Sequence, residues 1–484
     1  MCYKLGLEFF NGSITTLATD RFKASNTFSK LGAAQGVNQA AQCVGAILIA
    51  PLIKRWPTRT VLSGAIILFG LMTMILLIVD AATGGKMKPS SAKAAIYGDW
   101  NPNLIFVVWT LAGISYGMVD SRSFSSPADI IGGNVGKLRR MDAIVHVLYE
   151  VAGTAGAFGS SSAISRWGNN YSFFLTPVFF TLAAGIWVLI GTLGHPSTHR
   201  NEAGLSEIEQ GAKKSNYLVQ IVQGARAFAE SVWVGAMLVL SNRRFVWLLP
   251  SYALALYLHR FLESSLAPAF AKRVLGISAW SQIIVGGSNF GELLGALSVF
   301  FLSDIITTPH PWLRLDALAL NLVWLLPHYA TRAGHDVSWA WRFAGYFIPI
   351  SFGWAAGDVS LAAYIQSALS ENQMAHKNVS LLGAVMAFLY STYIVLNAIL
   401  SAVLGKVIDN DFVKNGNIES SLMRVGGIQF SVCCGIIFLS TLIPVGAFSL
   451  NPKVVDSVGR DHVSEEKDSL EEMDLKKKDV ESRS

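Results

Sequence analysis

The chain has 484 residues, of which 52% are hydrophobic and only 14% are charged. Soluble domains carry roughly a quarter charged residues, so this composition excludes an ordinary soluble protein and predicts a polytopic membrane protein. The formal net charge of +6 comes in part from loops that would face a lipid surface. No basic stretch is interleaved with aromatic residues, so we predict no nucleic-acid partner.

Apolar segments recur through residues 1–194, and most are close to the ~20 residues that cross a bilayer as an α-helix. The first, at residues 3–19, is weakly apolar and has no cytosolic tail before it, so we expect this helix to be short or truncated. The other segments lie at residues 31–53, 61–80, 104–126, 143–164 and 171–194. Together they predict an N-terminal bundle of six helices.

A polar stretch and a mixed segment come next, and we assign residues 195–244 to a cytosolic linker. The mixed segment, residues 217–241, has the composition of an amphipathic helix that lies in the membrane interface. Six more apolar segments predict a C-terminal bundle over residues 245–450; they lie at 245–267, 279–302, 313–329, 339–363, 379–404 and 426–450. The predicted fold is an all-α polytopic membrane protein with about 12 transmembrane helices in two six-helix bundles.

The last segment, residues 451–484, is dense in charges of both signs and nearly free of aromatic residues. Such a segment cannot bury enough apolar area to order itself. We therefore expect a disordered cytosolic tail.

Cysteines and histidines show no pattern of a metal site or a disulfide framework. The spacing of Cys2, Cys43, Cys433 and Cys434 fits neither, and the nine histidines are scattered. We therefore predict no cofactor and no metal. A membrane-embedded enzyme, which would need clustered catalytic groups at one membrane face, is a weaker alternative.

The two predicted bundles contain an internal echo, which is typical of duplicated transporters. The pentapeptide GISYG at residues 113–117 recurs as PISFG at residues 349–353. An aspartate follows each copy, Asp120 after the first and Asp358 after the second. The distribution of Lys and Arg over the loops modestly favours a topology with both termini in the cytosol.

The turn between the second and third segments carries a cluster of basic residues. With the twelve segments and the echo, it makes the chain similar to the major facilitator superfamily of secondary transporters, from about residue 3 to residue 450. That family's loop motif runs Gly-x-Leu-x-Asp-Arg-x-Gly-Arg-Arg, and Leu52, Arg55 and Arg59 match it here. In the first half, Lys54 occupies the position of the motif's aspartate. In the second half, Asp304 occupies the corresponding position and matches the motif. The signatures of sugar porters and drug antiporters are missing, and the chain resembles a fungal-like branch.

This resemblance implies that two bundles rock about a central cavity lined by the first, fourth, seventh and tenth helices. It implies an integral membrane protein, a monomer of the plasma membrane or the vacuolar membrane, whose partners are the lipid bilayer, a small-molecule solute and the proton. The expected function is proton-coupled transport of a small polar or charged solute by alternating access. A nutrient sensor that keeps the transporter fold without transport is the alternative.

Ionisable groups inside predicted spans are costly to bury and are therefore candidates for function. A buried carboxylic acid without a full counter-charge has a raised pKa and can exchange a proton near neutral pH. Helical spacing lets Glu263 meet either Arg260 or His259, although these residues could also simply cap the helix. The candidates for substrate binding or proton coupling are Glu8, Asn11, His146, Glu150, His259, Arg260, Glu263, Asn289 and Glu292.

A second set of charged residues lies near the predicted cytosolic ends of the helices. We expect the basic turn to pair with carboxylates supplied by other helices, with a purely structural role as the alternative. The candidates for this cytosolic gate are Lys54, Arg55, Arg59, Asp120, Arg122, Asp304 and Asp358.

Small residues are concentrated in two of the predicted helices. They are Gly153, Gly156 and Gly159 in the fifth helix, and Gly286, Gly287, Gly291 and Gly295 in the eighth. Small residues let helices approach closely and slide, and the resemblance places these two helices at the seam between the bundles. We therefore expect the glycines at this seam, where they would let the bundles rock. Plain tight packing of the helices, without a role in motion, is an equally good interpretation.

Overall fold

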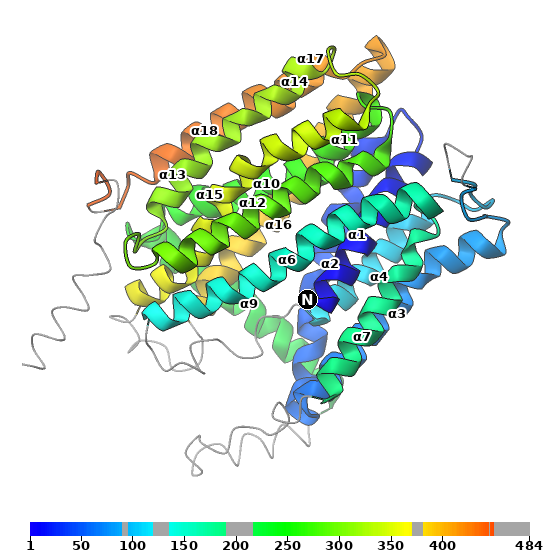
Figure 1. The fold of residues 1–484 in the computed structure, drawn as a ribbon. Coiled ribbons are helices and arrows are strands. Elements are labelled where there is room, and N and C mark those ends of the chain that lie inside the picture. The colour runs from blue at the N-terminus through cyan, green and yellow to red at the C-terminus, as the bar shows by residue number, and fades with distance from the viewer. Residues whose placement is uncertain (90–94, 120–134, 190–215, 370–380, 445, 450–484) are drawn as a thin grey trace, which may run out of the picture.

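The computed structural model describes residues 1–89, 95–119, 135–189, 216–369, 381–444 and 446–449, most of which lie in helices (Figure 1). Within these ranges the β-structure amounts to one isolated bridge, between Lys86 and Ile96. Eight of the described helices are long and apolar enough to cross a membrane. The predicted all-α membrane fold with two six-helix bundles is confirmed.

Six helical segments form the first bundle, and each overlaps its predicted span. They are α1 (Cys2–Arg21), α2 (Thr27–Arg55), α3 (Thr58–Ala82), α4 (Leu104–Val119), α6 (Val135–Trp167) and α7 (Leu175–Leu189). Although its sequence is weakly apolar, α1 has 20 residues. At 1.5 Å per residue that is ~30 Å, the thickness of a bilayer's hydrocarbon core.

The second bundle is less regular, because several of its spans are divided into shorter pieces. Its helices are α10 (Ala255–Phe261), α11 (Ala267–Arg273), α12 (Ser281–Leu302), α13 (His310–Ala319), α14 (Leu325–Tyr329), α15 (Val337–Leu369), α16 (Leu381–Asn415), α17 (Glu419–Ser421) and α18 (Gln429–Ser440). The pieces α10 and α11 belong to one span, Arg243–Arg273. The predicted tail, residues 451–484, lies outside the described residues.

The span Arg243–Arg273 is interrupted by two π-helical turns, Leu249–Leu254 and Leu262–Leu266. A proline lies in or beside each turn, Pro250 and Pro268. Proline lacks a backbone N–H and its ring crowds the preceding helical turn, so regular α-helix is disfavoured here. Turns of this kind occur frequently at functional sites, and the second one carries Glu263.

The bundles meet along two helix pairs, α6 with α12 and α2 with α16. In Figure 1 the bundles are close together at the end that carries the α1–α2 turn, and α2 runs away from the second bundle toward the α2–α3 turn, whereas α6 and α12 stay side by side. At this divergent end, Ala143 and Val147 of α6 still pack with Ala296 and Val299 of α12. With the predicted topology, the closed end is the outer one and the divergent end faces the cytosol.

An ion pair and hydrogen bonds to Asp20 hold the outer end closed. Lys272 approaches the Asp20 carboxylate at 2.6 Å, and Ser278 donates to it at 2.8 Å, both from the second bundle. Asn169 of the first bundle donates to the same carboxylate at 2.9 Å. Nearby, Asp409 accepts hydrogen bonds from the backbone N–H groups of Phe28 and Ser29. We call the group Asp20, Asn169, Lys272 and Ser278 the outer lock.

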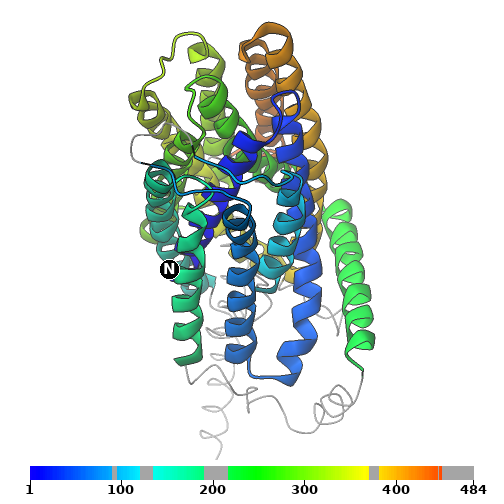
Figure 2. The ribbon, with the colours of Figure 1, turned by 90° about the vertical axis from the view of Figure 1, so that its right-hand side faces the viewer.

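The linker contains a helix, α9 (Tyr217–Ser241), with the bounds predicted for the amphipathic segment. It packs against α2 and α16, beside the seam (Figure 2). The Tyr217 hydroxyl donates to the carbonyl oxygen of Leu48 in α2 at 3.0 Å. Gly235 lies so close to Ala384 of α16 that a Cβ would overlap the Ala384 carbonyl. The helix thus bridges the two bundles.

Most of the glycines expected at the seam pack inside a bundle instead, which corrects that expectation. A Cβ at Gly156 would lie 2.6 Å from Glu8 Cβ of α1, in the same bundle. Gly287, Gly291 and Gly295 lie against the backbone of α15. Gly286 is an exception, because it faces Phe158 of α6 across the seam. The spacing of the glycines correctly indicated close helix packing, but it did not identify the helix against which they pack.

We predict that Gly291→Ala destabilises the protein by about 1–3 kcal/mol, because the new methyl group would overlap the Ile348 carbonyl and push α12 from α15. Gly345→Ala is the matched control, since the space around Gly345 of α15 is open. That change should be neutral or stabilise by about 0.5–1 kcal/mol. Thermal unfolding in detergent measures both, and equal melting temperatures for the two variants would contradict the prediction.

Candidate functional site

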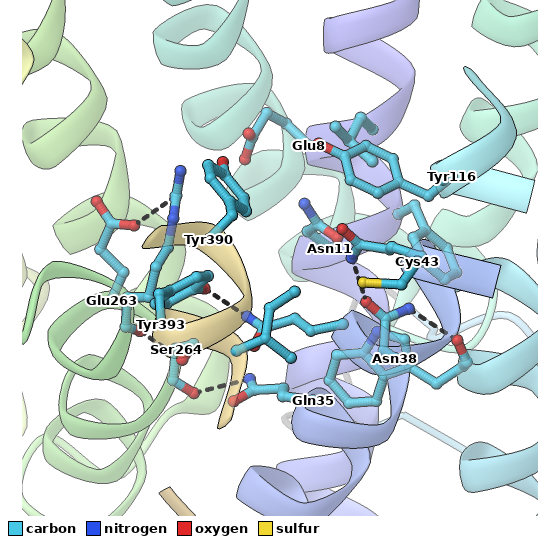
Figure 3. Close-up of a pocket in the computed structure, with 18 of the residues that line it drawn as sticks. Glu8, Asn11, Gln35, Asn38, Cys43, Tyr116, Glu263, Ser264, Tyr390 and Tyr393 are labelled. Atoms are coloured by element: carbon cyan, nitrogen blue, oxygen red, sulfur yellow. Dashed lines mark hydrogen bonds and ion pairs between the residues drawn. The ribbon is translucent and has the colours of Figure 1, made fainter. Parts of the chain in front are cut away.

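A cavity of about 390 Å³ lies between the two bundles (Figure 3). Its walls come from α1, α2, α3, α4, α6, α9, α12, α16 and the span Arg243–Arg273. On α2 the lining residues run from Gln35 to Ala46, and on α16 from Ala387 to Ile394. Both stretches lead toward the end where the bundles diverge, so the cavity extends in that direction.

The tenth predicted helix, residues 339–363, corresponds to α15. It was expected to line the cavity, but the described α15 residues do not. The walls there come from α2 and α16 instead. α15 packs behind α12, and its close contacts with Gly287, Gly291 and Gly295 keep it in the second layer.

On the first-bundle side, the cavity is lined by an ion pair within α1. Lys4 Nζ lies 2.7 Å from Glu8 Oε1, and the two residues are one helical turn apart. Both are buried, with 9% and 6% of their surface exposed. Lys4 also stands over the ring of Tyr149, 4.3 Å from its centroid, as in a cation–π contact. Sequence reasoning selected Glu8 but missed Lys4; the four-residue spacing is the signal that would have found it.

Glu150 joins this pair from α6. It is buried, and it interacts electrostatically with Lys4 and Glu8. No donor among the described residues reaches its Oε2. The absence of a side chain at Gly153 makes room for the group, because a Cβ there would lie 2.9 Å from both Glu150 Oε2 and Lys4 Cε. We call Lys4, Glu8 and Glu150 the Lys4 cluster. His146 is one turn from Glu150 and also interacts with it electrostatically.

On the second-bundle side, Arg260 and Glu263 form the other ion pair, with 3.1 Å between Nη1 and Oε2. This is the three-residue pairing that the sequence allowed. Ser288 of α12 donates a hydrogen bond to the other oxygen of Glu263. Glu292, one turn further along α12, is buried and interacts electrostatically with Arg260 and Glu263. We call Arg260, Glu263 and Glu292 the Arg260 cluster.

The two clusters also interact with each other across the seam. Glu150 lies within electrostatic reach of Arg260, and Glu292 within reach of Lys4. The joint group therefore has two permanent cations and four carboxylates. Complete ionisation would leave an excess of negative charge, which is strongly unfavourable away from water.

The rest of the lining is polar and aromatic. Gln35, Asn38, Gln39 and Gln42 form one face of α2; Gln35 donates to the Ser264 carbonyl at 3.0 Å, and Gln39 donates to the Tyr393 hydroxyl at 2.6 Å. In Figure 3, Glu8, Asn11 and Tyr116 face Glu263, Tyr390 and Tyr393 across the cavity. Asn289 of α12 also lines it. The cavity thus offers charged, amide and aromatic contacts.

His259 was expected at the site but lies in the interior of the second bundle. Its Nε2 is 2.8 Å from Asp316 Oδ1, and its ring stacks on Trp354. Histidine and aspartate are both almost fully buried, and neither lines the cavity. The helix turns by about 100° per residue, so His259 points away from the face on which Arg260 and Glu263 lie.

The predicted cytosolic gate is described only in part. Asp304 pairs with Arg140 of α6 at 2.6 Å, which links the bundles at the divergent end by an exposed ion pair. Asp120, Arg122 and the Lys54 side chain lie outside the described residues. Arg59 in α3, Arg55 in α2 and Asp358 in α15 are each partly buried, and their roles in a gate stay a prediction.

Comparison with known proteins adds a family match and several related folds. The family model described as Major Facilitator Superfamily matches residues 1–377. A D-xylose–proton symporter has a TM-score of 0.56 at 13% identity, over 91% of this chain and 95% of that chain. No curated protein sequence matches the chain.

Two further solved structures are similar at the level of the fold. The xylose transporter XylE from E. coli, in a partially occluded inward-open conformation, has a TM-score of 0.55 at 13% identity, over 90% of this chain and 95% of its own. A POT family transporter in complex with a thioalcohol-conjugated peptide has a TM-score of 0.51 at 13% identity, over 91% and 94%.

Proposed function

Because the chain belongs to the major facilitator superfamily, we propose that it moves a small polar or charged solute across a membrane by alternating access, driven by protons. The cavity between the bundles would hold the solute, and rocking of the bundles would expose it to each side in turn. One chain encloses the whole cavity, which supports a monomer as the working unit. We place this carrier in the plasma membrane or the vacuolar membrane of a fungal-like cell.

The excess of carboxylates over cations in the joined clusters is the observation that carries the proton coupling. Protons are the simplest charges that can neutralise Glu150 and Glu292 when the site is closed to water. Opening the cavity to water stabilises the ionised forms, and the protons can then leave. Each cycle would therefore couple the state of the carboxylates to the state of the bundles.

We predict that Glu150→Gln and Glu292→Gln each lower proton-coupled transport at least tenfold, because an amide imitates the neutral acid but exchanges no proton. The assay is proton movement in proteoliposomes that enclose a pH-sensitive dye, measured with sugars, dipeptides, organic acids and amines in turn. Glu230→Gln is the control, because Glu230 lies exposed on α9 and should leave transport unchanged.

Two results would reject the proton coupling. One is that no solute of the panel moves protons with the unmodified protein. The other is that the double variant Glu150→Gln/Glu292→Gln transports as the unmodified protein does. If solutes bind and the bundles move, but nothing is transported, the chain is a sensor with a transporter fold.

A further inference from the structure

The charge around the cavity distinguishes between classes of solute. Two sets of titratable and charged groups contribute to this charge. Those that line the cavity are Lys4, Glu8, Tyr149, Arg260, Glu263, Tyr390 and Tyr393. Behind them, within electrostatic reach, lie His146, Glu150 and Glu292. With a neutral His146, full ionisation gives two positive and four negative charges; a protonated His146 reduces the excess from two to one. An anionic solute would add to this excess, whereas a cation would cancel part of it.

Two buried polar atoms without hydrogen-bond donors also favour a cationic ligand. Glu150 Oε2 and Gln35 Oε1 are buried acceptors that no described donor reaches. Glu150 and Gln35 are 5% and 7% exposed, so water does not readily satisfy them. Gln35 lines the cavity itself. Buried acceptors without donors are costly, and a ligand in the cavity that brings N–H groups would satisfy Gln35 Oε1. Glu150 is not among the lining residues, so its charge would act on such a ligand through space.

Aromatic rings supply the third contribution. Tyr116, Tyr390 and Tyr393 line the cavity, together with Trp109 and Phe10. The faces of such rings attract ammonium and guanidinium groups, and their apolar bodies suit a hydrocarbon or aromatic part of the ligand. Tyr390 and Tyr393 lie on the same side as Glu263 (Figure 3), so aromatic and anionic groups converge there.

We propose that the solute is an organic cation with N–H donors and an apolar body, and that it exchanges with protons at the carboxylates of the Lys4 and Arg260 clusters. This proposal rests on the proposed function, because it assigns the solute of that same cavity. A monovalent cation replaces one proton and a divalent cation replaces two, so the charge of the occupied site stays constant. The cavity, at about 390 Å³, lies within the range of small-molecule sites.

The experiment uses three compounds with one phenol scaffold: tyramine, which is a cation, tyrosol, which is neutral, and 4-hydroxyphenylacetate, which is an anion. Spermidine and tetraethylammonium extend the cations to a polyamine and to an ion without N–H donors. Binding to the purified full-length protein is measured by thermal shift and titration calorimetry at pH 6 and pH 8. Proton release is obtained from calorimetry in buffers of different ionisation enthalpy.

We expect tyramine or spermidine to stabilise the protein, while tyrosol, 4-hydroxyphenylacetate and tetraethylammonium bind at least tenfold more weakly. If binding of the cation releases protons, its Kd should fall as the pH rises. The fall is up to about tenfold per pH unit for each proton displaced. Glu150→Gln should reduce this pH dependence, and Glu230→Gln should retain it.

The proposal is overturned if tyrosol or 4-hydroxyphenylacetate binds as tightly as tyramine, or if neither tyramine nor spermidine binds. It is also overturned if cations bind without releasing protons. Proton movement with a sugar, dipeptide or organic acid in proteoliposomes would then show that the proposed function stands with another solute. Absence of proton movement with every solute would instead reject the proposed function.

Discussion

Replacing Lys4 with methionine is expected to destabilise the protein more than any other single change considered. Lys4 is the cation that faces both Glu8 and Glu150. Removing one partner of a buried ion pair typically costs 3–5 kcal/mol, because an uncompensated charge is left behind. The variant should therefore melt at a markedly lower temperature and lose transport. Lys414→Met, at an exposed site near the end of α16, is the matched control and should melt as the unmodified protein does.

A double-mutant cycle separates the charge from the packing of the Lys4 side chain. Glu8→Gln added to Lys4→Met removes both members of the pair, so part of the stability should return. The recovery should be incomplete, because Glu150 still lacks its cation. If the two changes simply add, Lys4 and Glu8 are not coupled, and the assignment of the Lys4 cluster is wrong.

Asp20→Asn is expected to weaken the outer lock and shift the protein toward an outward-facing arrangement. The carboxylate accepts from Lys272, Ser278 and Asn169, and an amide cannot replace its charge. The ion pair is partly exposed, with 32% of the Lys272 side chain and 19% of the Asp20 side chain accessible. We therefore expect the substitution to change the free-energy difference between the inward-facing and outward-facing arrangements by about 1–2 kcal/mol. This corresponds to a shift of roughly five- to thirtyfold in their equilibrium.

Accessibility of a single cysteine measures this shift. In a variant without the native cysteines, Thr15→Cys places a thiol on the cavity wall of α1. A membrane-impermeant maleimide added from outside should label it faster when Asp20→Asn is present. Asp336→Asn changes an exposed carboxylate just before α15 and should not alter the rate. The exchange Asp20→Lys with Lys272→Asp should restore slow labelling; if it does not, the ion pair does not lock this end.

Local patterns in the sequence identified the elements of the fold well. Apolar run length located the membrane helices, and the mixed composition of residues 217–241 located α9. The three-residue spacing of Arg260 and Glu263 predicted their ion pair. In each case the information lies within one or two helical turns, where periodicity determines which side chains meet.

Contacts between distant segments were not predictable in this way. Asp20 and Lys272 are 252 residues apart, and hydropathy carries no signal for their pairing. His259 has the chemistry of a site residue. Because it precedes Arg260 by one residue, however, it lies on another face of the helix, where it contacts Asp316 in the bundle interior. The glycines of α12 likewise indicated close approach without identifying α15 as the neighbour.

The helix α9 would have a mechanical consequence for the proposed transport cycle. It contacts α2 through Tyr217 and α16 through Gly235, so it spans the two bodies like a strut. At 1.5 Å per residue, its 25 residues form a rod of ~37 Å that cannot stretch. If the bundles rotate as proposed, one of its two anchor points has to slip, and the hydrogen bond at Tyr217 is weaker than the close backbone packing at Gly235. In the proposed cycle we therefore expect the strut to stay with α16 and to slide over α2, which would limit how far the divergent end can open.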